Sequence, residues 1–116
     1  MIRKFFKGFR YAFIGISYAF NSQVNFKVHL LVAAGVGALG YYTGLNRMEW
    51  LWVTTAVTLV VVMELINTAI ELLVDQISPG YDPKAGIIKD VSAAAVLITA
   101  LLALIIGLFV FIPKYF

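Results

Sequence analysis

Four oxygen-bearing side chains recur at helical spacing in an otherwise apolar stretch. They are Glu64, Asn67, Glu71 and Asp75, and successive members are 3, 4 and 4 residues apart. At about 100° per residue they fall at about 0°, −60°, −20° and +20° around a helix, which is one narrow stripe. Such a stripe suits a cation, and hard Mg²⁺ prefers carboxylate oxygens together with substrate phosphates. The stripe therefore predicts a functional site that binds a cation.

A structural alternative for the stripe is a ladder of helix contacts, in which Asn67 and protonated glutamates hydrogen-bond to neighbouring helices. One asparagine is enough for such packing, and three acids on one face repel each other when ionised. A charged side chain inside a bilayer also costs about 2.5–3.5 kcal/mol on insertion scales. We therefore favour a functional site. An ion-translocating protein is disfavoured because no acid continues the stripe toward the opposite membrane surface.

A second pair of charges, Lys89 and Asp90, precedes the last apolar run. Lys89 is expected to balance the charge of phosphate oxygens, with snorkelling at the membrane edge as the structural alternative. Asp90 is expected either to cap the following helix or to orient Lys89. The small residues at 92–95 suggest that helices of the same or another chain approach closely there.

The elements that must position these groups are long and apolar. Runs over about 28–45, 48–74 and 91–112 predict three transmembrane helices, and the last has no charge over about 33 Å of helix. The chain is 62% hydrophobic and 13% charged over 116 residues. We expect an all-α integral membrane protein with one domain over 1–116. The absence of cysteine excludes thiolate chemistry, and the single histidine, His29, cannot form a metal cluster alone.

The first segment, residues 1–22, is predicted to be an amphipathic helix on the membrane surface. Large apolar side chains share one stripe, and basic side chains lie on another arc, at Arg3, Lys4, Lys7 and Arg10. The positive-inside rule places this segment and the loop at 75–90 in the cytoplasm. Nucleic-acid binding is not expected, because no basic patch interleaved with aromatic residues occurs elsewhere.

Two nucleotide-binding motifs are excluded. Gly35, Gly37 and Gly40 spell a dinucleotide fingerprint, but they lie inside a predicted span, where small residues instead favour close helix packing. No phosphate loop of the GxxxxGK[ST] type occurs in the chain.

A family resemblance appears in the motif itself. The string Glu64-Leu-Ile-Asn67-Thr-Ala-Ile-Glu71-Leu-Leu-Val-Asp75, joined to Lys89-Asp90-Val-Ser-Ala-Ala-Ala-Val, closely resembles the signature of the prokaryotic diacylglycerol kinase family, which includes undecaprenol kinase. The resemblance covers nearly the whole chain. It implies ATP- and Mg²⁺-dependent phosphorylation of the hydroxyl of diacylglycerol or undecaprenol. It also implies a bacterial inner-membrane homotrimer whose active sites are shared between chains.

The resemblance also implies a role for each matching residue. Glu64 matches the general base, Glu71 matches a ligand of Mg²⁺ and nucleotide, and Asn67 lies between them. The remaining positions expected to contact the nucleotide are Asp75 in the same motif, Lys89, Asp90, Tyr11 and, less directly, Lys4.

The chain departs from the family pattern at Gln23, where well-known members have a glutamate that pairs with Glu71 on the metal. Glutamine keeps an oxygen ligand but loses the charge, which predicts a weaker metal site. The alternative function is a non-catalytic membrane scaffold with an impaired metal site. Residues 25–29 resemble the N-x-x-[IV]-H segment of the undecaprenol kinase branch, which favours a polyprenol substrate. His29 is expected to make a polar contact rather than to act in catalysis.

Overall fold

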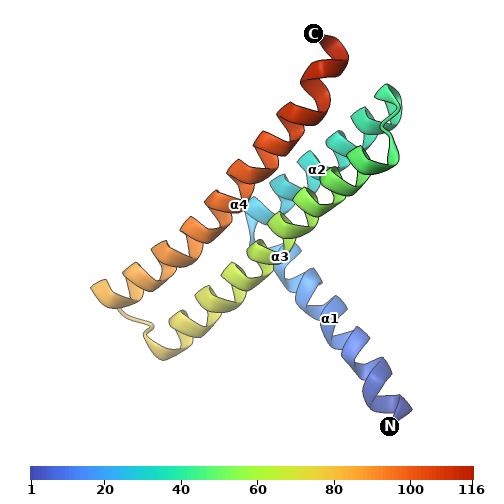
Figure 1. Cartoon of the computed structure of the whole chain (residues 1–116). Helices are drawn as coiled ribbons and strands as arrows, with labels where there is room; N and C mark the ends of the chain where they lie inside the picture. The colour runs from blue at the N-terminus through green and yellow to red at the C-terminus, as the bar shows by residue number, and fades with distance from the viewer.

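The computed structural model describes all of residues 1–116 and contains four helices joined by short turns (Figure 1). They are α1 (Ile2–Ser22), α2 (Val24–Thr43), α3 (Arg47–Ile77) and α4 (Pro83–Tyr115). By length and composition, α2, α3 and α4 are each able to cross a membrane. The prediction of an all-α chain with three long apolar helices is confirmed.

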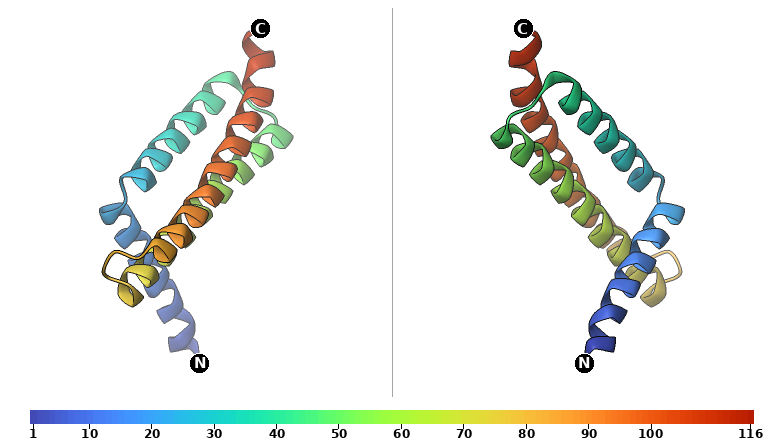
Figure 2. Two further views of the ribbon diagram at one scale, coloured as in Figure 1. Left: turned by 90° about the vertical axis from the view of Figure 1, so that its left-hand side faces the viewer. Right: turned by 90° about the vertical axis from the view of Figure 1, so that its right-hand side faces the viewer.

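The three long helices form a bundle, and α1 points away from it (Figures 1 and 2). The α3–α4 pair makes the most extensive contact, and α2 folds back along α3. The α2–α3 turn and the C-terminus lie at one end of the bundle, and the α3–α4 turn lies at the other. Helices joined by such short turns must run antiparallel, so residues early in α2 lie opposite residues late in α3.

The helices extend beyond the apolar runs. The helix α4 begins at Pro83, so the turn between α3 and α4 covers 78–82 and not 75–90. The prediction that Asp90 caps this helix is wrong. The capping residue is Asp82, whose Oδ1 accepts a hydrogen bond from the Lys84 backbone N–H at 3.0 Å. Pro83 at the first helical position already has the fixed φ that a helix start requires.

The glycine fingerprint lies within α2, as predicted, and its members differ in their surroundings. A Cβ added at Gly40 would lie 2.8 Å from Leu45 Cδ1 and 2.9 Å from Trp50 Cη2, whereas one added at Gly37 would meet nothing within 4 Å. Gly44 ends α2 in the left-handed region at φ 73°. Close packing of this part of the chain thus depends on the absence of a side chain at Gly40.

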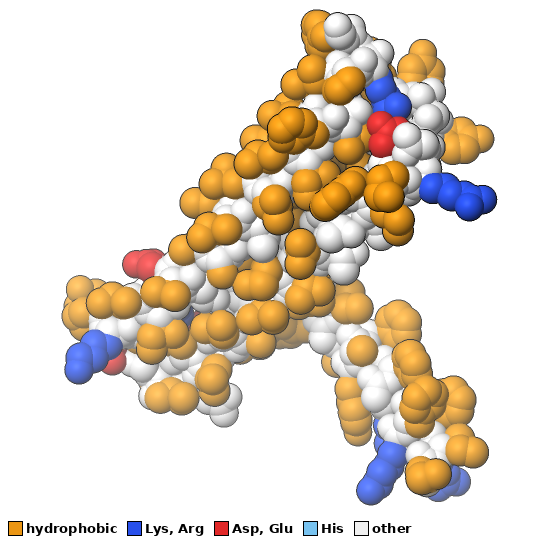
Figure 3. Space-filling view, in the orientation of Figure 1, with side chains coloured by type: hydrophobic (Ala, Val, Ile, Leu, Met, Phe, Trp, Pro, Cys, Tyr) orange, Lys and Arg blue, Asp and Glu red, His pale blue; other side chains and the backbone are white.

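The outer surface of the bundle is strongly apolar. Hydrophobic side chains cover it along its length, and charged side chains gather near its ends and on the N-terminal part of α1 (Figure 3). Only 14 of the 116 residues are buried in the single chain. Apolar side chains therefore face outward along the long helices, which is the arrangement that lipid or neighbouring chains would cover.

Candidate active site

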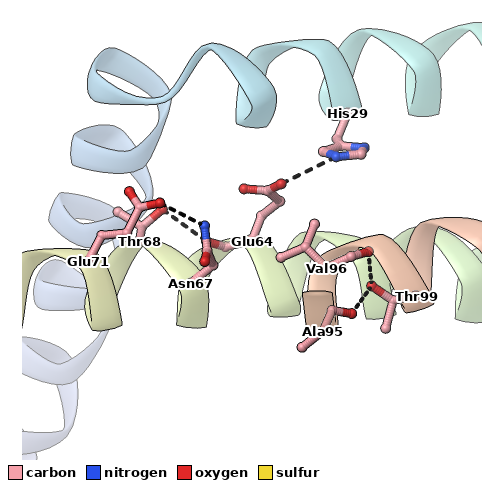
Figure 4. Close-up of polar contacts among 8 residues, drawn as sticks. All are labelled: His29, Glu64, Asn67, Thr68, Glu71, Ala95, Val96 and Thr99. Atoms are coloured by element: carbon pink, nitrogen blue, oxygen red, sulfur yellow. Dashed lines mark hydrogen bonds and ion pairs between the residues drawn. The ribbon is translucent and has the colours of Figure 1, made fainter. Parts of the chain in front are cut away.

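The polar stripe of α3 points toward α2 and the α1–α2 junction (Figure 4), and Asn67 also contacts Ser92 of α4. Glu64 is 2% exposed, Asn67 is 7% exposed, and Glu71 is partly buried. Asp75 lies one turn beyond Glu71, still within α3, but it is exposed. The stripe thus passes from the buried part of the bundle to its surface near the α3–α4 turn.

Gln23 reaches the stripe because the chain changes direction at this residue. It is the C-cap of α1 and the N-cap of α2, with an extended backbone at φ −117° and ψ 113°. From there its Nε2 donates a hydrogen bond to Glu71 Oε2 at 2.9 Å. Gln23 and Glu71, which were expected to bind a metal together, are thus in direct side-chain contact.

Asn67 connects the stripe to α4. Its Nδ2 donates to Glu71 Oε1 at 3.3 Å, and its Oδ1 accepts a hydrogen bond from Ser92 Oγ at 2.7 Å. Gln23, Glu71, Asn67 and Ser92 thus form one continuous chain of hydrogen bonds across three elements. Ser92 was not predicted as part of the site, although it is the one residue with a hydroxyl group among the small residues at 92–95.

Glu64 has a different environment. His29 Nε2 from α2 lies 3.3 Å from Glu64 Oε1, whereas Oε2 is buried without any hydrogen-bond partner. Leaving a buried carboxylate oxygen unpaired is costly, and in native structures such a group requires an explanation. Sequence reasoning expected only an unspecific polar contact from His29, because its partner lies 35 positions away along the chain.

The remaining predicted residues lie away from this network. Lys89 forms an ion pair with Asp75 near the α3–α4 turn, so it is paired with Asp75 and not with Asp90. Asp90 is exposed on α4. Lys4 and Tyr11 are exposed on α1 and make no hydrogen bond or ion pair with the other site residues. A single chain therefore brings together Gln23, the stripe and His29 but not the α1 positions.

An apolar groove of about 510 Å³ adjoins the site between α2, α3 and α4. His29 is part of its wall, and most of the lining is aliphatic, including Val32, Val36, Val57, Val60, Ala103 and Leu104. The groove has the chemistry of a seat for a hydrocarbon chain, and His29 connects it to Glu64.

The side chains of this network offer few ligands for a metal ion. The chain has no group of three or more histidine or acidic side chains that could hold an ion by themselves. The Gln23–Glu71 contact fits Mg²⁺, because turning the glutamine amide over would present its oxygen beside the carboxylate. Mg²⁺ is commonly held by one or two carboxylates together with water and substrate phosphates, so such a small set is sufficient.

Comparisons with known proteins agree with this geometry. The family model for prokaryotic diacylglycerol kinase matches residues 10–111. The chain is 36% identical over 113 residues to an undecaprenol kinase of Bacillus subtilis, a match that covers 97% of this chain and 92% of the relative. It is 38% identical over 100 residues to a diacylglycerol kinase of Synechocystis, covering 85% of this chain and 57% of that protein.

A more distant relative is a diacylglycerol kinase of Escherichia coli, with 27% identity over 95 residues that cover 82% of this chain and 78% of the relative. The family match spans the stripe, Gln23, His29, the helices α2 and α3, and most of α4. The names of these relatives are those of lipid kinases. The chain belongs to the prokaryotic diacylglycerol kinase family.

Proposed function

We propose that the protein transfers the γ-phosphoryl group of ATP to the hydroxyl of a membrane lipid alcohol in a Mg²⁺-dependent reaction. Diacylglycerol would give phosphatidate, and undecaprenol would give undecaprenyl phosphate. The observation that carries the proposal is the buried carboxylate of Glu64, whose Oε2 has no hydrogen-bond partner. This carboxylate lies beside an apolar groove and two helical turns from Glu71. The names of the relatives, undecaprenol kinase and diacylglycerol kinase, support the same pair of substrates.

Glu64 is the general base in this proposal. Its free Oε2 accepts the proton of the lipid hydroxyl as the oxygen of that hydroxyl attacks the γ-phosphorus in line, and ADP leaves. Burial keeps water away from this carboxylate, so the competing hydrolysis of ATP is limited.

Glu71 and Gln23 would hold Mg²⁺ through one carboxylate and one amide oxygen. The ion supplies positive charge next to the phosphates. Asn67, which already contacts Glu71, keeps that carboxylate oriented, and Ser92 in turn orients Asn67. The loss of one negative charge at Gln23 weakens the site relative to a pair of carboxylates.

The nucleotide is bound near the α3–α4 turn. Lys89 leaves Asp75 to contact phosphate oxygens, and this exchange is feasible because both side chains are partly exposed. Asp90 and Asp75 complete this part of the site. Tyr11, together with Lys4, covers the nucleotide from the surface helix α1.

The protein lies in the bacterial inner membrane, with its N-terminus and the α3–α4 turn in the cytoplasm. The helix α1 is amphipathic and lies on the membrane surface, where its basic residues meet anionic headgroups. The single domain over 1–116 assembles as a homotrimer. This assembly is supported by the exposed apolar faces of the long helices, and by Tyr11 and Lys4, which do not reach Glu71 within one chain.

The test is phosphate transfer from labelled ATP with Mg²⁺, to diacylglycerol and undecaprenol side by side. Glu64→Gln is the blank, and Glu49→Gln is the matched control, because it makes the same change on α3 at the opposite end of the bundle. Glutamine also serves in the capping box at that position. Transfer that disappears only in Glu64→Gln supports the kinase and identifies its preferred lipid. No transfer to either lipid by the folded protein would instead favour the non-catalytic scaffold.

A further inference from the structure

Two side chains at the start of α2 pair with the two glutamates of α3. Gln23 contacts Glu71, and His29 contacts Glu64. The partners are 6 residues apart at the start of α2 and 7 apart on α3. At 1.5 Å per residue these separations are about 9 Å and about 10.5 Å, so the antiparallel helices present one partner to each acid.

The contact of His29 is unlike that of Gln23, because Glu64 has no other side-chain partner. The Glu64 side chain is 2% exposed, and only Oε1 has a polar side chain nearby, with Nε2 at 3.3 Å. Figure 4 shows the imidazole pointing from α2 toward the carboxylate. A neutral imidazole with its hydrogen on Nε2 can donate to Oε1, whereas nothing in the chain donates to Oε2.

We infer that His29 is a positioning residue, which holds Glu64 through Oε1 and leaves Oε2 free for the lipid hydroxyl. The inference rests on the proposed role of Glu64 as the general base. Without the imidazole, the carboxylate would be free to turn to other torsion angles and rotamers, and neither oxygen would be held where the lipid hydroxyl arrives. His29 also lines the apolar groove, so its ring forms the wall where a lipid chain would lead to Glu64.

The competing explanation is that His29 only holds α2 against α3. A packing role concerns the amount of folded protein, whereas a positioning role concerns the turnover of each folded molecule and acts through Glu64. The two roles are therefore separable by measuring kcat per folded enzyme and by a double-mutant cycle with Glu64.

The first experiment compares His29→Gln, His29→Asn and His29→Leu. The glutamine amide reaches about as far as Nε2, the asparagine amide does not, and leucine has no donor. We expect kcat to fall about tenfold to a hundredfold in His29→Leu and His29→Asn, to be largely preserved in His29→Gln, and KM for ATP to stay constant. Thr43→Val is the control, since this α2 hydroxyl bonds only to its own helix.

The second experiment repeats His29→Leu in the Glu64→Gln background. If His29 acts through Glu64, the residual rate should not fall further. An unchanged kcat in His29→Leu, an equal loss in His29→Gln and His29→Asn, or an independent loss in the Glu64→Gln background would each overturn the inference. Full turnover by Glu64→Gln alone would instead refute the proposed base, which is a separate result. If His29→Leu does not fold, the comparison of the two amides still decides.

Discussion

The two halves of α3 differ in how completely their glutamates are paired. At the end with the α2–α3 turn, Asn46 and Glu49 form a reciprocal capping box, and Glu49 pairs with Lys114 at 3.0 Å. In the half that leads to the α3–α4 turn, Glu64 keeps one buried oxygen without a partner. Both arrangements are built on the same helix, α3.

The contacts around Glu49 contribute to stability, whereas the arrangement around Glu64 serves the proposed function. A closed set of caps and ion pairs stabilises the turn, with a contribution of about 1 kcal/mol for a good N-cap. An unpaired buried oxygen costs about 1–3 kcal/mol and contributes nothing to folding. The chain retains that cost where the groove and the stripe meet, which supports the proposed placement of the reaction in this half of the bundle.

Apart from the loss of transfer expected in Glu64→Gln, the largest expected effect is at Glu71. We expect Glu71→Gln to lower turnover at least about a hundredfold, because the carboxylate that would hold Mg²⁺ beside the phosphates is lost. Glu49→Gln, beside the α2–α3 turn, should leave turnover close to wild type. Initial rates of phosphate transfer at a series of Mg²⁺ concentrations measure both. Equal rates in Glu71→Gln and Glu49→Gln would show that the two halves of α3 do not differ in their importance for turnover.

A smaller effect, on stability, is expected at the end of the bundle that contains the α2–α3 turn. Gly40→Ala should lower the free energy of unfolding by about 1–3 kcal/mol, because its Cβ would collide with Leu45 and Trp50. Gly37→Ala is the matched control on the same helix, where a Cβ meets nothing. Thermal unfolding in detergent gives the difference, and turnover per folded molecule should not change. If both variants unfold alike, this end is not tightly packed around Gly40.

The smallest effect is expected at Gln23. In Gln23→Glu, two carboxylates face each other, so the protein should be less stable in a chelator and regain stability when Mg²⁺ is added. The Mg²⁺ concentration for half-maximal turnover should fall about threefold to tenfold, because ligand charge raises affinity. Thermal unfolding and rates in parallel Mg²⁺ titrations test this. An unchanged Mg²⁺ dependence would show that residue 23 is not a ligand.

Much of the fold follows from local patterns. Long apolar runs predict three helices, and the structure confirms them. The structure also confirms that the glycine fingerprint lies inside one of these helices and not in a loop. The helix boundaries were less predictable. The pattern of apolar residues ends at the membrane edge, whereas a helix ends where capping geometry stops it, so Pro83 and Asp82 begin α4 well before its apolar run. The assignment of a cap to Asp90 failed for this reason.

The sequence by itself determined which residues lie together, because the spacing of Glu64, Asn67 and Glu71 requires a shared helical face whatever surrounds it. Only the tertiary structure decided their partners. Gln23, His29 and Ser92 come from outside α3 and reach the stripe through the register of antiparallel helices. That register depends on the turns and on packing between distant segments, and the spacing of residues along one helix does not specify it.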